Sequence, residues 1–415
     1  MKSLDDWLSY IEELHPKAWD LGLGRVNQVA EELGLKEHTA LVFTVAGTNG
    51  KGSTCEFIEQ FCLEVGYSVG KSTSPHILRF NERIQINGKA VSDQDIISAF
   101  ETIETARGNV SLTYFEFSVL ASVLIFARGN VDVWVLEVGL GGRLDAMNIF
   151  DRDVTVVTQI ALDHQAWLGS TRELIALEKA AILRSNIPCI VADPDPPSSF
   201  KQYASRIGSQ TYYIGDDFNY ENNIIDIQGR VISEVPVSHL PKSSAVAALQ
   251  AVSSLGIVIS DSQIFDVISR TRLMGRLQWC DTTPRVLCDV AHNPAATIYL
   301  RDYVKNYLLS FESKPRVHAL VGMYSDKEIS KVIQLMSETV HQWYFTDMDD
   351  SRAANAEDLQ SVLDDRSHVV TCDNIGSALR EARKDLAIDD LIVVYGSFPV
   401  VAGVLGSLSK FHLEE

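Results

Sequence analysis

The 415-residue sequence lacks any excess of positive charge, and this absence excludes several kinds of partner. Lysine and arginine number 36 against 55 aspartates and glutamates, so the formal net charge is −19. A strongly acidic chain repels the phosphates of nucleic acids and anionic membrane surfaces. We therefore expect no nucleic-acid and no membrane partner. Any anionic substrate must be met by a local basic or metal site.

Long apolar runs and paired cysteines are also missing. No stretch of about 18 apolar residues occurs, which is the length that a helix needs to cross a bilayer. The first residues are partly acidic where a signal peptide would be apolar. The six cysteines form no C-x-x-C pair, which in a chain of this size favours reduced, mostly buried thiols. These absences predict a cytoplasmic protein.

Short apolar segments alternate with segments of helical spacing along most of the chain. Apolar runs occur at 41–46, 131–138, 154–160, 189–191, 286–290, 317–321, 343–345, 369–372 and 391–394. Helix-like stretches include 4–14, 94–106, 115–127, 171–183, 244–255 and 376–386. Buried strands that alternate with helices predict an α/β architecture with mainly parallel sheets.

The expected organisation is two domains. A length of 415 residues allows two or three at about 150 residues each. The polar stretch 193–243 predicts a small antiparallel sheet at an edge, and a second α/β series begins near Arg276. We predict an N-terminal P-loop ATPase-like domain over 1–273, with a mainly parallel sheet and a small antiparallel edge sheet. A C-terminal Rossmann-like α/β domain follows over 274–415.

A glycine-rich turn follows the apolar run 41–46. It reads Gly47-Thr48-Asn49-Gly50-Lys51-Gly52-Ser53-Thr54 and leads into a helix-like stretch. Glycines let backbone N–H groups turn toward a phosphate, and the next helix offers its positive end. Lys51 supplies a charge to the outer phosphates, and Ser53 or Thr54 can present a hydroxyl to Mg²⁺. The turn predicts a nucleotide-phosphate site. The match to the common P-loop is incomplete, because Val45 stands where that motif has its first glycine, and a glycine-rich turn without a ligand is the alternative.

Residues suited to a magnesium ion lie at the ends of other predicted strands. Glu137 ends the run 131–138, at the edge where open α/β sheets bind ligands. Asp163 and His164 follow the run 154–160, and Ser74 follows a short predicted strand near 68–71. One hydroxyl, one carboxylate and one imidazole would suit Mg²⁺, which keeps several water and phosphate ligands. Spacing alone leaves two alternatives open, namely that His164 is a structural histidine and that Glu137 is a surface residue before a turn.

The motifs together resemble those of the Mur ligase superfamily, and within it the bacterial enzymes with both dihydrofolate synthase and folylpolyglutamate synthase activity. The resemblance covers nearly the whole chain. Besides the glycine-rich loop, it is carried by Asp20-Leu21-Gly22-Leu23-Gly24-Arg25-Val26, Ser74-Pro75-His76, Asn81-Glu82-Arg83-Ile84, Leu112-Thr113-Tyr114-Phe115-Glu116, Leu136-Glu137-Val138-Gly139-Leu140-Gly141-Gly142-Arg143-Leu144-Asp145, Ala161-Leu162-Asp163-His164, Glu178-Lys179-Ala180, Gly275-Arg276 and Asp289-Val290-Ala291-His292-Asn293-Pro294. This ordered series is far more specific than a glycine-lysine loop alone.

The resemblance implies a role for each of these residues. ATP would be bound by Gly47, Thr48, Asn49, Gly50, Lys51, Gly52, Ser53, Ser244, Arg276, Asp289 and His292. Metal would be bound by Ser53, Ser74, Glu137 and His164. Substrate would be bound by Asp20, Leu21, Gly22, Leu23, Arg25, Arg83, Thr113, Tyr114, Phe115, Glu116, Leu144, Asp145 and Ala146. Lys51, His164 and Lys179 would be catalytic, with Lys179 carbamylated, whereas from spacing alone Lys179 indicates a surface ion pair.

The resemblance also implies the reaction and its partners. Transfer of the γ-phosphoryl of ATP to a pteroate or folate carboxylate would give an acyl phosphate, which the amine of L-glutamate then attacks, releasing ADP and phosphate. The substrates would be dihydropteroate, folates and L-glutamate. The cofactors would be two Mg²⁺ ions and a monovalent cation such as K⁺. We expect a monomer whose two domains close on the nucleotide.

Three positions depart from the family pattern. Ser244 stands where family members often carry Asn, and Ser325 stands where a His often precedes Asp-Lys. Pro399 stands where the motif Gly-Ser-Phe-His has its last residue. All three lie outside the phosphate loop and the predicted metal ligands, so we expect altered affinity and an unchanged reaction.

Three other functions are compatible with a nucleotide loop. A cell-wall peptide ligase of the same superfamily would need a separate N-terminal domain for its sugar nucleotide, and the loop at residue 47 leaves no room for one. A nucleotide-gated switch would not need the carboxylate, imidazole and lysine set. A small-molecule kinase would release a stable phosphorylated product.

Overall fold

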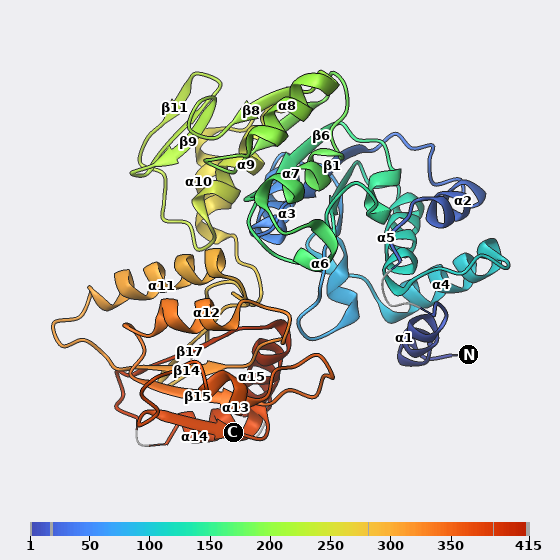
Figure 1. Cartoon of the computed structure of the whole chain (residues 1–415). Coiled ribbons are helices and arrows are strands. Elements are labelled where there is room, and N and C mark those ends of the chain that lie inside the picture. The colour runs from blue at the N-terminus through green and yellow to red at the C-terminus, as the bar shows by residue number, and fades with distance from the viewer. Residues whose placement is uncertain (1, 17–19, 281, 385, 412–415) are drawn as a thin grey trace. The chain divides into compact units, whose positions relative to one another are not determined.

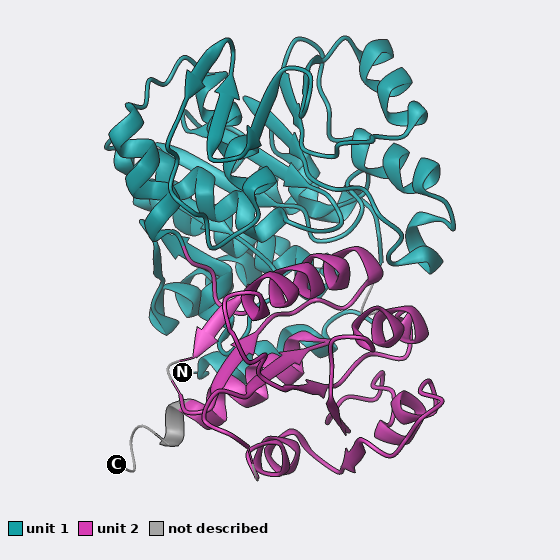
Figure 2. Ribbon diagram, turned by 90° about the vertical axis from the view of Figure 1, so that its left-hand side faces the viewer, with its two compact units in different colours: residues 1–271 teal, residues 272–415 magenta. Residues whose placement is uncertain are grey.

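The computed structural model describes residues 2–16, 20–280, 282–384 and 386–411. These residues form two compact units, 1–271 and 272–415 (Figure 2). Each unit has its own sheet or sheets and its own buried apolar cluster. The predicted fold class is confirmed, because both large sheets are mainly parallel and alternate along the chain with helices (Figure 1).

The first unit contains an eight-stranded sheet in the order β4-β3-β2-β5-β1-β6-β7-β8. Its strands are β1 Leu41–Ala46, β2 Val69–Ser72, β3 Ile84–Ile86, β4 Lys89–Ala90, β5 Val133–Glu137, β6 Val154–Val157, β7 Pro188–Val191 and β8 Gln210–Tyr213. All neighbours pair in parallel except for β2 with β3 and β3 with β4. β1 lies between β5 and β6, so the carboxyl ends of these three strands share one edge, where such sheets bind ligands.

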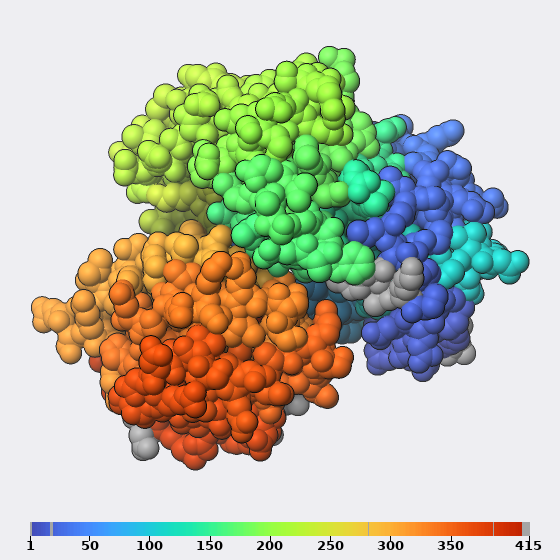
Figure 3. Space-filling view, viewed as in Figure 1, coloured from blue at the N-terminus to red at the C-terminus, as the bar shows by residue number. Residues whose placement is uncertain are grey.

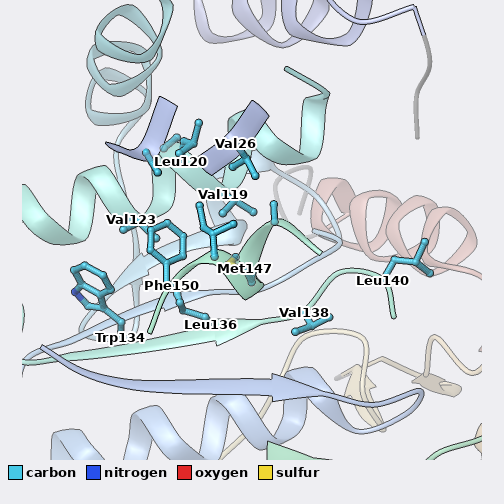
Figure 4. Packing of buried hydrophobic residues seen from close by; sticks show 14 of the residues in the cluster. Val26, Val119, Leu120, Val123, Trp134, Leu136, Val138, Leu140, Met147 and Phe150 are labelled. Atoms are coloured by element: carbon cyan, nitrogen blue, oxygen red, sulfur yellow. The ribbon is translucent and has the colours of Figure 1, made fainter. Parts of the chain in front are cut away.

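Helices of the first unit alternate with these strands. They are α1 Leu4–Glu13, α2 Gly24–Glu32, α3 Lys51–Glu64, α4 Asp93–Arg107, α5 Tyr114–Gly129, α6 Gln165–Leu168, α7 Arg172–Ala180, α8 Ser198–Ile207, α9 Lys242–Ser253 and α10 Asp261–Arg270, with short 3₁₀ turns η1 Phe80–Arg83 and η2 Ala146–Ile149. Val119 and Val123 of α5 lie in one buried apolar cluster with Leu136 of β5 and with Phe150, which follows η2 (Figure 4). This packing fixes the strand whose last residue is Glu137.

The expectation of an antiparallel insert over 193–243 is correct only in part. Strands β9 Phe218–Glu221, β10 Ile224–Ile227 and β11 Arg230–Ile232 do form an antiparallel sheet. The preceding residues, however, belong to the main α/β series. Strand β8 pairs in parallel with β7, and α8 connects the two strands. Phe200 and Ala204 of α8 are buried at helical spacing, a signal that the polar composition of the stretch obscured. This segment lies on the surface of the first unit (Figure 3).

The second unit contains a six-stranded sheet in the order β12-β13-β17-β14-β15-β16. Its strands are β12 Gln278–Cys280, β13 Arg285–Cys288, β14 Val317–Val321, β15 Gln342–Thr346, β16 Val369–Cys372 and β17 Leu391–Tyr395, and its helices are α11 Pro294–Leu308, α12 Ile329–Met336, α13 Ala356–Gln360, α14 Ile375–Ala382 and α15 Phe398–Phe411. Only the edge strand β12 is antiparallel. The loops after β13 and β17 are therefore neighbours at one edge.

No helix among the described residues is both long and apolar enough to cross a membrane.

Candidate functional site

Glycines build the turn between β1 and α3. Gly47 has a φ of +150°, and a Cβ placed there would lie 1.7 Å from Oγ1 of Thr158. Gly50, at the N-cap of α3, has a φ of +89°, a left-handed conformation that favours glycine. The first N–H groups of a helix have no partner within the helix and carry partial positive charge. The turn can therefore offer backbone donors to a phosphate, as the sequence predicts.

Hydrogen bonds hold this turn against the loop that follows β6. The backbone N–H of Thr48 donates to the carbonyl of Gln159 at 2.7 Å, and the Thr48 hydroxyl donates to the carbonyl of Ala161 at 3.1 Å. The Asn49 amide donates to Oε1 of Gln159 at 3.0 Å. Because the same loop continues to His164, the fold brings the predicted ATP-binding and metal-binding segments together.

Lys51, Glu137 and Ser74 come from three different strand ends and meet at the sheet edge. The Lys51 ammonium donates to the carbonyl of Thr48 at 3.3 Å and lies 4.0 Å from Oε1 of Glu137. Oε2 of Glu137 accepts the backbone N–H of Ser74 at 3.0 Å. The Glu137 side chain is buried at the end of β5, so its charge is poorly screened by solvent. A cation and a carboxylate thus lie beside the phosphate turn.

The donor chemistry at this edge fits a magnesium ion. Ser53 is buried in the first turn of α3, and His164 is the N-cap of α6, with a left-handed φ of +49°. Nε2 of His164 lies 4.0 Å from Oδ1 of Asp163. The described residues contain no group of three or more His, Cys, Asp and Glu that could hold a metal alone. A hydroxyl, carboxylate and imidazole set is compatible with this, since Mg²⁺ takes its remaining ligands from water and phosphate.

Lys179 does not form the surface ion pair that its spacing indicates. It is buried on α7, and its ammonium donates to the carbonyl of Gly47 at 2.9 Å. The surface pair is made instead by Glu178 with Arg143, at 2.9 Å. Burial, followed by the nearby Lys51 charge, lowers the pKa of Lys179 to about 7. The spacing argument failed because helical periodicity does not reveal which neighbour covers a side chain.

The predicted substrate residues of the first unit form two clusters. In the first, Arg25 donates to the Asp20 carboxylate at 2.6 Å and to Glu116 at 3.2 Å. Glu116 also accepts the backbone N–H and the hydroxyl of Thr113, at 2.8 and 2.9 Å, which closes a capping box at the start of α5. This cluster joins the segment before α2 to the start of α5.

The second cluster contains residues that sequence reasoning singled out less clearly. The guanidinium of Arg83 lies 5.5 Å from the ring centroid of Tyr114 and 5.6 Å from that of Phe80. Its Nε donates to Nδ1 of His76 at 2.8 Å. Burial, followed by the Arg83 charge, lowers the pKa of His76 to about 4, so this histidine is neutral near pH 7. His76 and Phe80 were not predicted as site residues, although the Ser-Pro-His motif is a signal for the former.

The remaining predicted substrate residues shape the walls around β5. A Cβ on Gly139 would lie 2.5 Å from the Phe115 ring, so the two pack directly. Asp145 is buried and accepts the N–H groups of Leu140 and Met147 at 2.9 Å each. Burial raises the pKa of Asp145 to about 6. Leu144 is half-buried, Ala146 is buried, and Leu21, Gly22 and Leu23 are half-buried before α2.

In the second unit, Arg276 and His292 lie against Phe398, and the charges of both act on Asp289. The guanidinium of Arg276 lies 5.1 Å from the ring centroid of Phe398, and the His292 ring lies 6.4 Å from it. Asp289 accepts the N–H groups of Leu277 and Ala291 at 2.8 Å each. Burial raises the pKa of Asp289, an effect that Arg276 opposes. Sequence reasoning missed Phe398, which begins the helix after β17.

The structure shows the surroundings of the three residues that depart from the family pattern. The Ser244 hydroxyl donates to the carbonyl of Gly50 at 3.4 Å, so this residue does contact the phosphate turn. Ser325 is exposed, and its hydroxyl donates to the carbonyl of Arg352 at 3.0 Å. Pro399 lies in the first turn of α15, where proline costs no hydrogen bond.

Two family descriptions match the chain. The Mur ligase middle domain matches residues 45–235, and the Mur ligase glutamate ligase domain matches residues 275–398. The chain is 41% identical over 407 residues to the dihydrofolate synthase/folylpolyglutamate synthase of Escherichia coli K12, an alignment that spans 97% of this chain and 94% of the relative.

Solved structures match the whole fold. The E. coli enzyme in complex with DHPP and ADP superposes with a TM-score of 0.94 at 40% identity, covering 99% of both chains. The bifunctional folylpolyglutamate synthase/dihydrofolate synthase of Yersinia pestis, complexed with AMPPNP and a manganese ion, gives a TM-score of 0.93 at 38% identity and covers 99% of this chain and 98% of that one.

Proposed function

Because this chain belongs to the dihydrofolate synthase/folylpolyglutamate synthase family of Mur ligases, we propose that it joins L-glutamate to 7,8-dihydropteroate and to tetrahydrofolate through acyl phosphates. The expectation of an ATP-dependent ligase that forms a carbon–nitrogen bond is confirmed by the family membership. The single observation that carries the proposal is the sheet edge where Lys51, Glu137 and Lys179 surround the glycine turn.

The chemistry requires an activated carboxylate, since hydroxide is a poor leaving group. The γ-phosphoryl of ATP is transferred to the pteroate or folate carboxylate, and the glutamate amine then displaces phosphate to form the amide. Lys51 neutralises charge on the transferring phosphoryl group. Bound Mg²⁺ would be held by Ser53, Ser74, Glu137 and His164 and would neutralise phosphate charge. No covalent enzyme nucleophile is needed.

Lys179 serves this reaction as a carbamate. Its buried amine has a pKa near 7, so a neutral form that can react with carbon dioxide is available at physiological pH. The neutral nitrogen attacks carbon dioxide, a C–N bond forms, and the nitrogen releases one proton to give the carbamate anion. Counted from the protonated ammonium, two protons are released and the buried group changes from a cation to an anion. The modified side chain thereby presents negative charge beside the phosphate turn, where it can orient a metal-bound water or the metal itself. Lys179 and His164 are thus the proposed catalytic partners of Lys51.

We assign the pterin end of the substrate to the walls in the first unit. The Arg25, Asp20 and Glu116 cluster offers both donors and acceptors, which a pterin ring needs. The neighbouring Tyr114 and Phe115 supply aromatic surface, and Asp145 lies in the same wall region after β5. The rest of the predicted set, Leu21, Gly22, Leu23, Arg83, Thr113, Leu144 and Ala146, completes these walls.

The second unit serves ATP through Arg276, Asp289 and His292, and it carries glutamate recognition. The match of residues 275–398 to a glutamate ligase domain supports this division. The proposed domains are 1–273 for ATP and pterin and 274–415 for glutamate.

ATP and a divalent metal are the cofactors; two Mg²⁺ ions, a K⁺ ion, a monomeric state and a cytoplasmic location are further parts of the proposal. All six cysteines are free thiols, which suits a reducing compartment.

The test is product analysis with purified full-length protein. Dihydropteroate or tetrahydrofolate is incubated with ATP, Mg²⁺ and excess L-glutamate, and products are identified by mass spectrometry. We expect one added glutamate on dihydropteroate, further glutamates on tetrahydrofolate, and one ADP per bond. ADP release without glutamate would indicate a switch, and activity on a muramyl peptide alone would indicate a cell-wall ligase.

Lys51→Met is the variant that links this activity to the proposed site. Loss of one preorganised charge at a transferring phosphoryl group lowers kcat by about 10²–10³. Lys89→Met, at an exposed lysine on β4, is the matched control and should keep full activity. Equal activities of the two variants would remove Lys51 from the mechanism.

A further inference from the structure

A buried ion cluster lies in the first unit outside the residues assigned above. Lys71 on β2 is 1% exposed, and its ammonium contacts the carboxylates of Glu56 and Glu59. Glu56 and Glu59 lie one turn apart on α3 and are 9% and 0% exposed. We call Lys71, Glu56 and Glu59 the α3–β2 ion cluster. Three charged groups are rarely buried together unless each has a partner of opposite sign.

The cluster joins three elements of the fold. Oε1 of Glu59 accepts the backbone N–H of Gly88, in the turn between β3 and β4, at 2.8 Å. Oε1 of Glu56 accepts the side-chain amide of Gln60 at 3.1 Å. The lysine therefore links α3 to β2, and Glu59 links α3 to the β3–β4 hairpin. Each link is directional, so the cluster sets the position of α3 along β2 as well as its distance.

The cluster lies close in sequence to two proposed metal ligands on these same elements. Glu56 follows Ser53 by three residues, which is about one helical turn. Lys71 precedes Ser74 by three residues, which is about 10 Å of extended chain. The backbone N–H of Ser74 donates to Glu137 of β5, which holds Ser74 at the sheet edge, whereas Ser53 belongs to α3. A shift of α3 relative to β2 would therefore change the distance between the two serine hydroxyls.

Stability alone does not require charges at this place. Replacing a buried ion cluster by well-packed uncharged side chains is often neutral or stabilising, whereas removing a single partner is strongly destabilising. We propose that the α3–β2 ion cluster is a positioning device that sets the spacing of Ser53 and Ser74, and so the affinity of the metal–nucleotide site. This inference rests on the proposed function, since it assumes that both serines serve the metal.

The experiment separates positioning from stability by removing the charges together. The triple variant Lys71→Met, Glu56→Gln, Glu59→Gln carries no charge in the cluster and keeps an acceptor for Gly88. Lys71→Met alone leaves two buried carboxylates and should lower Tm by roughly 10 °C. The triple variant should recover most of that Tm. Mn²⁺ binding in the presence of AMPPNP is then measured by electron paramagnetic resonance on the full-length chain.

We expect the triple variant to bind Mn²⁺ with AMPPNP about 10- to 100-fold more weakly than the wild type, the range seen when groups behind metal ligands are changed. Glu56→Gln, which keeps the Lys71–Glu59 contact, should give a smaller weakening and provides a second, milder variant. Arg107→Met is the matched control, because it removes the Arg107–Glu104 ion pair of α4 in the same unit. It should lower Tm without changing Mn²⁺ affinity.

Wild-type affinity in a folded triple variant, or in Glu56→Gln if the triple variant does not fold, would overturn the positioning role while leaving the proposed function intact. A wild-type chain that binds no Mn²⁺ with AMPPNP would contradict both the inference and the proposed function.

Discussion

Lys179 shows how one buried side chain gains its chemistry from its surroundings. Its ordinary pKa of 10.5 falls to about 7 because the ammonium is removed from water and faces the Lys51 charge. The hydrogen bond to the Gly47 carbonyl holds the nitrogen beside the phosphate turn. A free surface lysine would be protonated at pH 7 and would not react with carbon dioxide.

The residue-scale prediction concerns pH and bicarbonate. Below pH 7 the unmodified Lys179 is mostly protonated, so the neutral amine that reacts with carbon dioxide decreases about tenfold per pH unit, and activity should fall with it. Added bicarbonate at pH 7–8 should restore activity, and ¹³C-bicarbonate should give a carbamate signal in the wild type. Lys179→Gln is the control and should show neither the signal nor the rescue. Full activity of Lys179→Gln would exclude a catalytic carbamate.

The sign of the stability effect follows from the same pKa. The folded-state pKa of unmodified Lys179 lies below its unfolded value, so the unfolded chain binds more protons between about pH 7 and 10.5. This group therefore lowers stability below pH 7, and the penalty disappears as the pH rises through that window. Carbamylation removes the penalty in another way, by replacing the ammonium with an anion.

At the scale of elements, α4 and α5 of the first unit both begin with a capping box, as α1 and α10 also do. Thr113 caps α5 and bonds with Glu116, and Ser92 caps α4 and bonds with Asp95. Both caps satisfy an unpaired N–H group at the helix start. Only the Thr113 box also holds a carboxylate that contacts Arg25 in the proposed pterin wall. The pair therefore distinguishes a structural cap from one that also organises a binding site.

Thr113→Ala and Ser92→Ala test this distinction. Each loses a cap and should lower the free energy of unfolding by about 1 kcal/mol, measured by denaturant titration. Thr113→Ala alone should raise the KM for dihydropteroate several-fold, because Glu116 loses the Thr113 hydroxyl donor, keeps only the backbone N–H, and holds Arg25 less firmly in place. An equal KM in the two variants would show that the α5 cap is only structural.

At the scale of the whole molecule, the net charge of −19 makes the site depend on a cation. ATP and the folate substrates are anionic, and the protein as a whole repels them. Lys51 and a bound metal must therefore supply the local positive charge. Binding to the folded state alone should stabilise the protein according to mass action.

Metal removal gives the whole-molecule prediction. At a concentration about 100 times its Kd, Mg·ATP should add about 2.7 kcal/mol to folded-state stability, and Tm should rise by several degrees. EDTA should abolish most of the rise, since ATP without Mg²⁺ meets the carboxylate of Glu137 unneutralised. The measurement is thermal denaturation with each ligand, and Lys51→Met should show a smaller rise. If ATP raised the Tm as much in EDTA as it does with Mg²⁺, nucleotide binding would need no metal.

The sequence by itself determined the elements that depend on local pattern. β1, β14 and β16 have the predicted bounds, because a short apolar run between polar residues has few other ways to be buried. The glycine turn could also be predicted from the sequence, since Gly47 and Gly50 adopt backbone conformations that favour glycine. Glu137 could be predicted at a strand end because parallel strands place their carboxyl ends at one edge, whereas Asp289 was predicted only from the family resemblance.

Only the tertiary structure decided which distant residues meet. Lys179 is covered by a turn 132 residues away, and Arg276 lies against Phe398 from another strand end. The α3–β2 ion cluster was not predicted from the sequence, because nothing in the spacing of Lys71, Glu56 and Glu59 shows that they are buried. Burial depends on the packing of elements far apart in the chain, and it is burial that changes the pKa of Lys179 and holds the cluster together.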